Sequence, residues 1–466
     1  MARKFFVVVF ASTRRALLNL SNYHLDLFQA TAQTAQNQEF TIEGLLSLEE
    51  VERLVNDGYR VLIQEEASKR ARATQEVTSF QEWMQAMGEP TGEDATLRTL
   101  EISAAPPNGY LRTEGIEATL QRLAIAYPSI CQVIQLPEKT WEQRTSRAIR
   151  IGQNSGRERS GILLLGGVHA RELVNPDLLI SFALKLCQAY QAGTGLTFGN
   201  KSYDATTIQQ IVNQVDLFIF PLVNPDGRAF VQSATGDPMW RKNRNPNRGQ
   251  SCKGVDLNRN FDFLWSSGIG TSSSSCSEIY RGRKAFSEPE TRNVRYLLDT
   301  YKNITTMLDI HSYSKLVMYP WGDDEDQTTN ATMNFHNPAY NGLRGTLGDT
   351  AYKEYLTRED LNWFTTTCNR VRDGIRSVRG TVYTVQQSIG LYPTTATSDD
   401  YAYSRCFVDH SKRRVLACAI ETGSEFQPPY AEALNIIAEV SAGLIEFCAA
   451  SMTLTESAQE VALIST

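Results

Sequence analysis

The first 66 residues alternate between short apolar runs and stretches in which apolar side chains have helical spacing. Three runs are typical of strands: KFFVVVF (4–10), EFTIEGLL (39–46) and YRVLIQ (59–64). Two stretches repeat apolar residues every three or four positions, as helices do: TRRALLNLSNYHLDLF (13–28) and SLEEVERLVNDG (47–58). In the second stretch, Ser47 and Glu50 match a capping box and Gly58 is a stop signal. Residues 1–66 are therefore expected to form a small open α/β sandwich.

The region from 109 to 455 carries the same two patterns in longer elements. Its strand-like runs are SRAIRIG (146–152), SGILLLGG (160–167), VDLFIFPLVN (215–224), TTMLDIHSYS (305–314), KLVMYPWG (315–322) and RRVLACAIE (413–421). Its helix-like stretches are PDLLISFALKLCQAYQ (176–191), EPETRNVRYLLDTYKN (288–303) and EALNIIAEVSAGLIEFCAA (432–450). Strands that alternate with helices predict one large α/β domain with helices around a central sheet.

Residues 67–108 follow neither pattern clearly. The segment begins with charged, helix-like sequence and ends in the loop signals GEPTGED and AAPPNG. Few of its side chains are expected to reach a core. Its basic residues Lys69, Arg70, Arg72 and Arg98 would be open to proteolysis in an exposed linker. We expect a linker or activation segment between the two domains.

Charge and hydropathy narrow the possible partners. The 466 residues carry 46 basic and 52 acidic side chains, for a net charge of −6. This balance gives no electrostatic reason to expect a nucleic acid or an anionic membrane as partner. No apolar run reaches the roughly 18 residues needed to span a bilayer. The start, MARKFFVVVFA, has the basic and apolar parts of a signal peptide, but two arginines follow, so we favour a folded strand.

Polar side chains follow two of the predicted strands where those strands end. GILLLGG leads into HARE, which holds His169 and Glu172 three positions apart, and LDIHSYS places His311 at the end of another strand. In α/β folds the functional site lies at the carboxyl ends of strands. Two histidines and one carboxylate, with water as a further ligand, form a catalytic zinc site. The HxxE pattern alone is weak, because such pairs are common on helix surfaces.

Seven motifs in order resemble those of the zinc metallocarboxypeptidases of the carboxypeptidase A/B type. They are HARE (169–172), NPDG (224–227), MWRKNR (239–244), GVDLNRNF (254–261), LDIHSYS (308–314), LYPTTATSDDYAY (391–403) and AIETG (419–423). The resemblance implies a mixed central sheet flanked by helices, preceded by a pro-domain. It also implies one Zn²⁺ held by His169, Glu172 and His311.

The resemblance assigns further roles by position in these motifs. Asp256 would orient the first histidine. Glu421 would be the general base and Arg241 would stabilise the oxyanion. Without the family, Glu421 could be a helix-capping acid and Arg241 one member of a solvated basic cluster.

Another group of residues is implied to bind the substrate. Asn258 and Arg259 would hold the terminal carboxylate of a peptide, because arginine binds a carboxylate with two parallel hydrogen bonds. Tyr392 would close over the bound end, and Arg171 would add positive charge near the groove.

The side-chain pocket has its own candidate residue. Asp399, seven residues after Tyr392, would lie at the bottom of the pocket and favour basic or mixed C-terminal residues. The alternative is that Asp400 faces the pocket and Asp399 points away.

The resemblance also bears on cysteines, processing and partners. Cys252 and Cys276 match a disulfide of the family, and Cys406 is a possible partner for Cys368. We expect a monomeric extracellular enzyme made as a zymogen, with an activating protease and with peptide or protein substrates that have a free C-terminus. Two alternatives are a relative that acts on modified peptides and a catalytically inactive relative that only binds peptides.

One departure from the digestive members of the family lies between Tyr392 and Glu421. The residues SRCFVDHSKRR (404–414) look like an inserted surface loop near the site. Such a loop could alter access to the site or carry His410 towards its rim.

Overall fold

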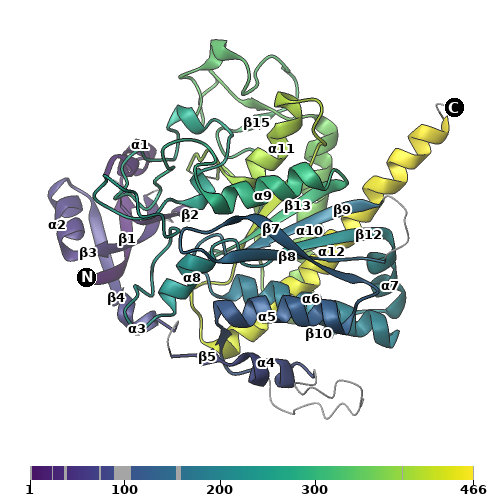
Figure 1. Cartoon of the computed structure of the whole chain (residues 1–466). Helices are drawn as coiled ribbons and strands as arrows, with labels where there is room; N and C mark the ends of the chain where they lie inside the picture. Colours follow the sequence, from purple (N-terminus) through teal and green to yellow (C-terminus); the bar gives the residue numbers. More distant parts are fainter. Residues whose placement is uncertain are drawn as a thin grey trace.

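The computed structural model describes residues 3–23, 25–35, 39–72, 75–88, 107–153, 159–390 and 392–464, with the backbone alone for 455–464. It divides into a small N-terminal unit and a large α/β domain, which lie side by side (Figure 1). The large domain contains a mixed eight-stranded sheet flanked by helices, as the sequence predicts.

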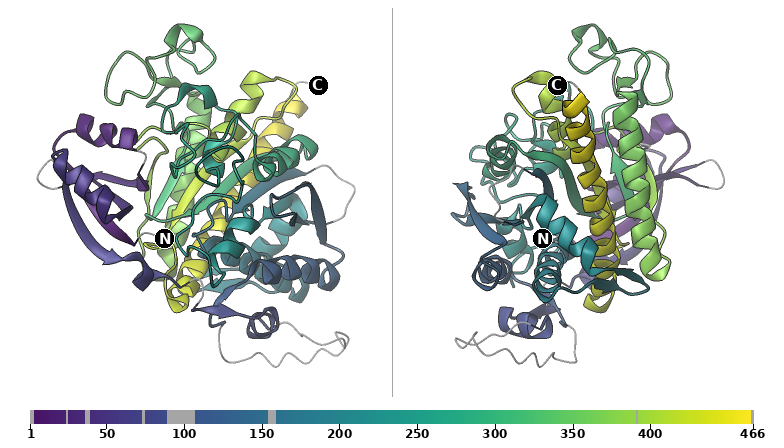
Figure 2. Two further views of the ribbon diagram at one scale, coloured as in Figure 1. Left: turned by 60° about the vertical axis from the view of Figure 1, so that its left-hand side comes forward. Right: turned by 90° about the vertical axis from the view of Figure 1, so that its right-hand side faces the viewer.

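The N-terminal unit is a four-stranded antiparallel sheet with helices, in the order β2-β3-β1-β4. Its elements are β1 (Lys4–Ala11), α1 (Arg14–Asn19), the 3₁₀ turn η1 (Leu20–Tyr23), β2 (Leu27–Thr34), β3 (Phe40–Ser47), α2 (Leu48–Asn56) and β4 (Arg60–Glu66). The predicted capping box is present at the start of α2, where the Ser47 and Glu50 side chains each accept a hydrogen bond from the other's backbone N–H. The views of Figure 2 show the unit as a separate layer against the large domain.

The predicted long helix over 13–28 is wrong in its second half. Helix α1 ends at Asn19, and Leu27 begins the edge strand β2 instead. Leu27 pairs with Gly44 of β3. A Cβ at Gly44 would lie 2.8 Å from Leu27 Cδ2, so a glycine lets the two strands approach. This non-local pairing prevails over the helical spacing of the leucines.

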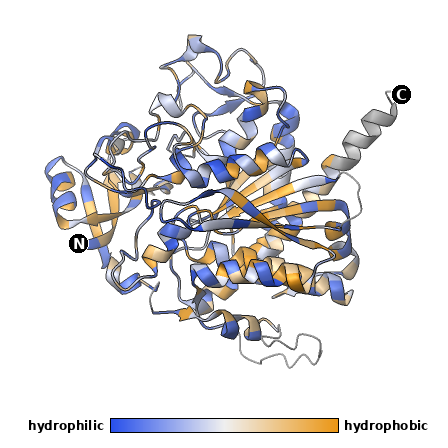
Figure 3. Ribbon diagram, in the orientation of Figure 1, coloured by the Kyte–Doolittle hydropathy of each residue, from blue (hydrophilic) through white to orange (hydrophobic). Residues whose placement is uncertain are grey.

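The large domain is built on the strand order β17-β14-β18-β13-β9-β12-β8-β7. Its strands are β7 (Cys131–Lys139), β8 (Thr145–Ile151), β9 (Ser160–Gly166), β12 (Val215–Phe220), β13 (Ile304–Ser312), β14 (Leu316–Tyr319), β17 (Thr384–Gln387) and β18 (Leu416–Thr422). Strands β18, β13, β9 and β12 are mutually parallel, and those towards both edges include antiparallel pairs. The central strands are almost entirely apolar (Figure 3), because both of their faces are covered.

Helices and short elements complete the domain. The helices are α5 (Thr113–Ala126), α6 (Val174–Ala192), α7 (Ala205–Gln214), α8 (Pro225–Val231), α9 (Pro289–Thr300), α10 (Arg358–Arg379), α11 (Ser398–Val408) and α12 (Tyr430–Ile464). The short elements are β6 (Tyr110–Leu111), β10 (Leu196–Phe198), β11 (Lys201–Tyr203), η2 (Leu257–Arg259), η3 (Trp265–Ser267), β15 (Asp326–Gln327), η4 (Pro338–Tyr340) and β16 (Glu354–Tyr355). Helix α11 continues through Val408, so only the second half of the predicted loop at 404–414 is a loop.

Helix α12 runs beside α10, as the right-hand view of Figure 2 shows. Its segment Tyr430–Leu454 is the one stretch among the described residues with the length and composition of a membrane span. The window that meets this test is 72% buried within the structure. Residues such as Val440 and Ile445 are fully buried in the main core, so packing accounts for the apolar character of this helix.

The segment between the two domains contributes more core than the sequence predicts. It forms α3 (Ala67–Arg70), β5 (Val77–Thr78) and α4 (Phe80–Ala86). Trp83 and Met84 on α4 are each 1% exposed and belong to the main core. Residues 89–106, with Arg98, lie outside the described residues.

Candidate metal centre and substrate pocket

The parallel strands β9, β13 and β18 bring three candidate residues together. His169 follows β9 by three residues, and His311 and Glu421 lie near the ends of β13 and β18. His311 and Glu421 are direct partners in the pairing of these two strands. After β9 the chain turns at Gly167, which has φ +64°, and a Cβ there would lie 2.9 Å from Pro176 Cγ. Glycine is therefore required where the chain turns towards His169.

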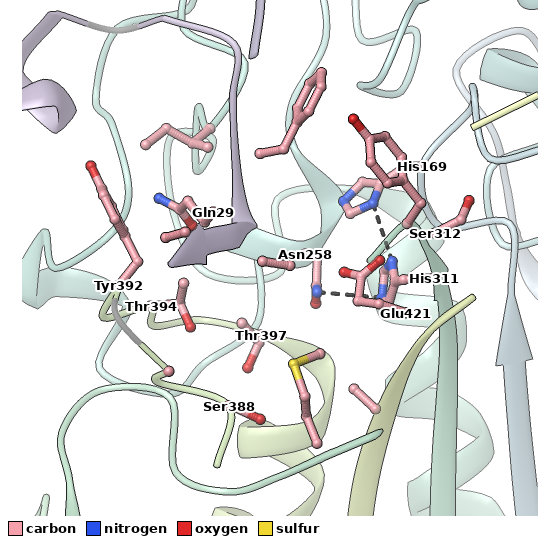
Figure 4. Close-up of a pocket in the computed structure, with 18 of the residues that line it drawn as sticks. Gln29, His169, Asn258, His311, Ser312, Ser388, Tyr392, Thr394, Thr397 and Glu421 are labelled. Carbon is pink, nitrogen blue, oxygen red and sulfur yellow. Dashed lines mark hydrogen bonds between the residues drawn. The ribbon is translucent and has the colours of Figure 1, made fainter. Parts of the chain in front are cut away.

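His169, Glu172 and His311 form a compact buried group. Glu172 Oε1 lies 2.7 Å from His169 Nδ1, and Glu172 Oε2 lies 3.3 Å from His311 Nδ1. The two Nδ1 atoms are 3.1 Å apart, and Figure 4 shows the two rings facing each other. Two imidazole nitrogens and a carboxylate are the ligands that zinc favours in catalytic sites.

The remaining ring nitrogens of both histidines are held by carboxylates. His169 Nε2 lies 3.1 Å from Asp256 Oδ1, and His311 Nε2 lies 3.0 Å from Asp309 Oδ2. A carboxylate next to Nε2 keeps a proton on that nitrogen, so each Nδ1 presents a lone pair. Two lone pairs 3.1 Å apart repel each other unless a cation lies between them. The donor atoms therefore fit a Zn²⁺ ion.

Asp256 also joins the first histidine to Arg241. Arg241 donates to Asp256 Oδ2 from Nη2 at 2.9 Å and from Nε at 3.2 Å. Burial alone would raise the pKa of Asp256, but the charge of Arg241 leads the interactions that outweigh burial and hold this pKa well below its usual value. The ion pair fixes the guanidinium of Arg241 at the wall of the cavity next to the metal group.

Glu421 places a carboxyl group beside the metal group. Its Oε2 atom is buried and has no hydrogen-bond partner among the described residues. Burial raises the pKa of Glu421 to about 8, a shift that His311 opposes and Glu172 reinforces. A carboxyl group in a cavity with a pKa in this range is suited to accept and release a proton near neutral pH.

A cavity of about 120 Å³ opens beside these groups. Its walls include Arg241, Asn258, Arg259, Tyr392 and Asp399. Asn258 Oδ1 accepts a hydrogen bond of 2.9 Å from the backbone N–H of Ser398. Arg259 is buried, and its Nη2 donates to Gln29 Oε1 of the N-terminal unit at 2.6 Å. Figure 4 shows Gln29 on β2 entering the cavity from the N-terminal unit.

The two neighbouring aspartates at the start of α11 point in different directions. Asp399 lines the cavity, and its Oδ2 accepts a hydrogen bond of 3.3 Å from Ser388 Oγ. Asp400 accepts from the backbone N–H of Gly322 at 3.1 Å and is not among the residues that line the cavity. Burial raises the pKa of Asp399, so a cationic side chain would relieve an unfavourable buried charge there.

Two of the expected substrate-binding residues are engaged by the N-terminal unit. Arg171 is fully buried, pairs with Asp26 and does not line the cavity. Tyr392 is 4% exposed and packs in the apolar core of the N-terminal unit, with residues such as Val7 and Leu17. In this arrangement Arg171 is not available to a substrate, whereas Tyr392 lines the cavity but is held by the N-terminal unit.

The comparison with known proteins decides the family. The family model described as zinc carboxypeptidase matches residues 116–440, which is well over half of the chain. The chain belongs to the zinc carboxypeptidase family. This family consists of metallocarboxypeptidases, which are hydrolases.

Curated carboxypeptidases are similar to parts of the chain. Carboxypeptidase B from Astacus astacus is 31% identical over 296 residues, which are 63% of this chain and 81% of that protein. Carboxypeptidase B from Helicoverpa zea is 34% identical over 232 residues, 48% of this chain and 49% of that protein. Carboxypeptidase A4 from Mus musculus is 33% identical over 46% of this chain and 47% of that protein. The aligned part spans about half the length of the last two relatives.

Solved structures share the fold of this chain over nearly its whole length. Carboxypeptidase A from Helicoverpa armigera superposes with a TM-score of 0.69 at 20% identity, and covers 97% of this chain and 98% of that one. Thrombin activatable fibrinolysis inhibitor superposes with a TM-score of 0.68 at 19% identity, and covers 97% and 99%. The N-terminal unit fits a pro-domain in this fold.

The candidate site contains residues that the sequence analysis missed. They are Asp309 at His311, Ser398 at Asn258, and Asp26 and Gln29 from the N-terminal unit. Asp309 carried one signal, because it interrupts the buried apolar run TTMLDI. The residues of the N-terminal unit carried none, because their partners are more than a hundred positions away.

The cysteines of the chain follow the prediction in part. Cys252 and Cys276 form a disulfide with an S–S distance of 2.01 Å. The proposed pair of Cys368 with Cys406 is wrong, because Cys368 Sγ lies 3.7 Å from Cys418 Sγ inside the core. Cys406 instead sits on the last turns of α11, where its Sγ lies 3.7 Å from the carbonyl oxygen of Tyr403.

Proposed function

We propose that the chain is a zinc-dependent carboxypeptidase that removes the C-terminal residue of peptides and proteins and is made as an inactive precursor. The observation that supports this most is the convergence of three kinds of group on one cavity. The group of His169, Glu172 and His311 lies beside Glu421, and Arg259 stands further along the same wall. A metal, a base and a carboxylate-binding arginine are what an exopeptidase of this kind needs.

The proposed reaction is hydrolysis of the last peptide bond. A Zn²⁺ ion bound by His169, Glu172 and His311 would act as a Lewis acid on the carbonyl and would lower the pKa of a bound water. Glu421 takes a proton from the attacking water and passes it to the leaving amine as the C–N bond breaks. Arg241, fixed by Asp256, stabilises the negative charge that develops on the carbonyl oxygen.

Four further side chains are proposed to hold the substrate. Arg259 and Asn258 bind the terminal carboxylate, and Tyr392 closes over it once the N-terminal unit has left. Asp399 binds the side chain of the terminal residue and favours lysine or arginine, or a mixed set that includes them. Its place in the cavity wall supports it over Asp400.

The N-terminal unit is proposed to be an inhibitory pro-domain over 1–66, joined by an activation segment over 67–108 to a catalytic domain over 109–455. Gln29 takes the hydrogen bond of Arg259 that a substrate carboxylate would take, and Asp26 holds Arg171. The unit also has an apolar contact with the large domain, in which Phe28 packs against Tyr313 and Phe426. A substrate cannot enter while these contacts persist.

The contacts of 75–88 favour one position for the activating cut. Strand β5 pairs with β6, and Glu76 accepts a 2.5 Å hydrogen bond from the backbone N–H of Tyr430. Trp83 and Met84 lie in the main core. This segment therefore behaves as part of the catalytic domain. A cut within 89–106 alone would leave the inhibitory unit attached to it.

We accordingly place the cut after Lys69, Arg70 or Arg72, on the inhibitory side of that segment. The chain with all three changed to glutamine should resist activation by trypsin, whereas Arg98→Gln should activate like the wild type. Activation that is lost in Arg98→Gln and kept in the triple variant would place the cut in 89–106 instead.

The proposed partners and location follow from this function. Peptide and protein substrates with a free C-terminus and an activating protease are expected, and the chain is expected to act as a monomer. The Cys252–Cys276 disulfide supports an oxidising, extracellular setting.

The function is tested by following release of C-terminal arginine or phenylalanine from blocked dipeptides, before and after limited trypsin treatment, with and without a zinc chelator. Release of arginine that is blocked by the chelator and rises after trypsin treatment would support three proposals together: the zinc dependence, the inactive precursor and the role of Asp399 in the pocket. Release of phenylalanine alone would refute the role of Asp399. No release of either, in protein that contains zinc, would favour modified peptides or a binding role.

A further inference from the structure

The second histidine of the metal group has its own buried carboxylate. Asp309 lies two residues before His311 on β13, and residues two apart in a strand point to the same side. Asp309 is fully buried, and its Oδ2 lies 3.0 Å from His311 Nε2. Asp256 is placed in the same way beside the first histidine, with its Oδ1 atom 3.1 Å from His169 Nε2.

The neighbours of His311 decide which group accepts its Nε2 proton. Asn258 Nδ2 also lies near Nε2, at 3.4 Å. Because Asn258 Oδ1 accepts the Ser398 N–H, the Asn258 amide turns its own N–H groups towards the ring. An amide nitrogen cannot accept a proton. Asp309 is therefore the acceptor, and His311 Nδ1 is left with a lone pair that faces Glu172.

Asp309 is also held from its other side. Ser398 Oγ donates a short hydrogen bond to the same Oδ2 atom that faces His311. Ser398 begins α11 and precedes Asp399, the proposed pocket residue. One carboxylate oxygen thus connects the metal group to the start of the pocket helix.

We propose that Asp309 is a positioning residue for the metal: it orients the His311 ring with Nδ1 towards Zn²⁺ and strengthens that nitrogen as a ligand. The inference rests on the proposed function, because it requires that the site binds zinc. Asp309 touches neither substrate nor metal and acts through His311. Carboxylates in this role contribute about 10- to 100-fold to metal affinity.

The test measures zinc affinity of the full chain by competition with a chromophoric chelator, independently of activity. The variants are Asp309→Asn, which keeps the shape and removes the charge, and Asp309→Ser, which also shortens the side chain. Asp373→Asn is the matched control, because Asp373 is exposed on α10. We expect zinc to bind about 10- to 100-fold more weakly to the Asp309 variants, with Asp309→Ser the weaker of the two, and the control to match the wild type.

The outcomes separate this inference from the proposed function. Zinc affinities of both Asp309 variants within twofold of the wild type would overturn the role of Asp309 and leave the enzyme assignment intact. A wild type that binds no zinc would overturn both.

Ser398→Ala distinguishes positioning of His311 from anchoring of α11. If Asp309 acts on the metal through His311, the loss of the Ser398 hydroxyl changes zinc affinity less than threefold. An equal loss in Ser398→Ala and Asp309→Asn would show that the helix contact is what matters, and would overturn the proposal.

One measurement needs no variant, in case the substitutions prevent folding. With ¹⁵N-labelled histidine in the zinc-loaded wild type, we expect His311 to carry its proton on Nε2 and to show a downfield, slowly exchanging N–H resonance. An unprotonated Nε2 would overturn the proposal.

Discussion

The carboxylate of Asp26 holds the guanidinium of Arg171 with two hydrogen bonds of 2.6 and 2.9 Å. Arg171 lies between His169 and Glu172 in the sequence, and its side chain is fully buried. Its guanidinium carbon also lies 4.2 Å from the ring centre of Phe426. The N-terminal unit is therefore attached by a buried ion pair to the turn that carries two of the proposed metal ligands.

Replacing Asp26 by asparagine should weaken the inhibition without any cut. Breaking a buried ion pair by removing one partner costs about 3–5 kcal/mol, and the uncut variant should hydrolyse a blocked C-terminal arginine dipeptide measurably faster than the uncut wild type. Asp57→Asn is the control, because Asp57 lies in the same unit and its exposed side chain accepts a hydrogen bond from Tyr23 Oη at 2.8 Å. An Asp26→Asn chain as inactive as the uncut wild type would show that the apolar contact alone holds the unit.

The same pair predicts how acid affects the attachment. Burial acts to raise the pKa of Asp26, but Arg171 outweighs it, so the folded-state pKa is lowered. Stability from a lowered carboxyl pKa is present above the unfolded pKa, about 3.9, and is lost as the pH falls through the folded value. After the cut, the N-terminal unit should bind the catalytic domain more weakly at pH values below about 3.9 than at pH 6, as its retention with that domain in gel filtration would show. Equal retention at both values would contradict the prediction.

Asp399 should set the preference for a basic C-terminal residue. Truncating one partner of a buried charge pair costs about 2–5 kcal/mol, so Asp399→Asn should lower kcat/KM for C-terminal arginine by roughly 30-fold or more and leave phenylalanine little changed. The adjacent Asp400→Asn is the matched control, because Asp400 binds the backbone of Gly322. If Asp400→Asn alone reverses the preference, the two assignments must be exchanged.

Arg259→Lys tests the binding of the terminal carboxylate. Lysine keeps the charge but loses the paired hydrogen bonds, and a hydrogen bond to a charged group contributes about 1.5–3 kcal/mol. The activated variant should therefore show a kcat/KM about 10- to 100-fold lower, mainly through KM. Arg248→Lys, a change at an exposed site, should have no effect. A normal KM in Arg259→Lys would remove Arg259 from substrate binding.

Asp323 should make the zinc-loaded protein less stable as the pH rises. Burial raises its pKa to about 7, and Asp324 adds to the shift. The folded state therefore holds a proton that the unfolded state releases near pH 4, and stability falls as the pH rises from about 4 to 7. Between pH 5 and 8, the melting temperature of Asp323→Asn should fall less than that of the wild type. Parallel melting curves for the two proteins would contradict this.

Local patterns were enough where a segment's neighbours in sequence decide its structure. The segments β9, β13 and β18 were predicted as strands from their continuous apolar runs, which are typical of strands covered on both faces. The Ser47–Glu50 cap was predicted because it needs only residues that are close in sequence. Helix α10 was missed, since its apolar positions, such as Phe364 and Val371, are sparse in a charged sequence. Its buried face is recognised only from the elements it packs against, chiefly α12 and also β14.

By itself, the sequence determined the central strands of the large sheet, the order of the motifs and the residue types able to bind zinc, because these depend on chemistry and short-range spacing. Only the tertiary structure decided that β2 is a strand, that Trp83 is core and that Asp26 reaches Arg171. It also decided that Asp309 faces His311 and that Asp399, not its neighbour, faces the cavity. Each of these depends on which distant surfaces pack together or on where one side chain points. Neither can be read from the spacing of residues along the chain, because both are set only when the whole chain has folded.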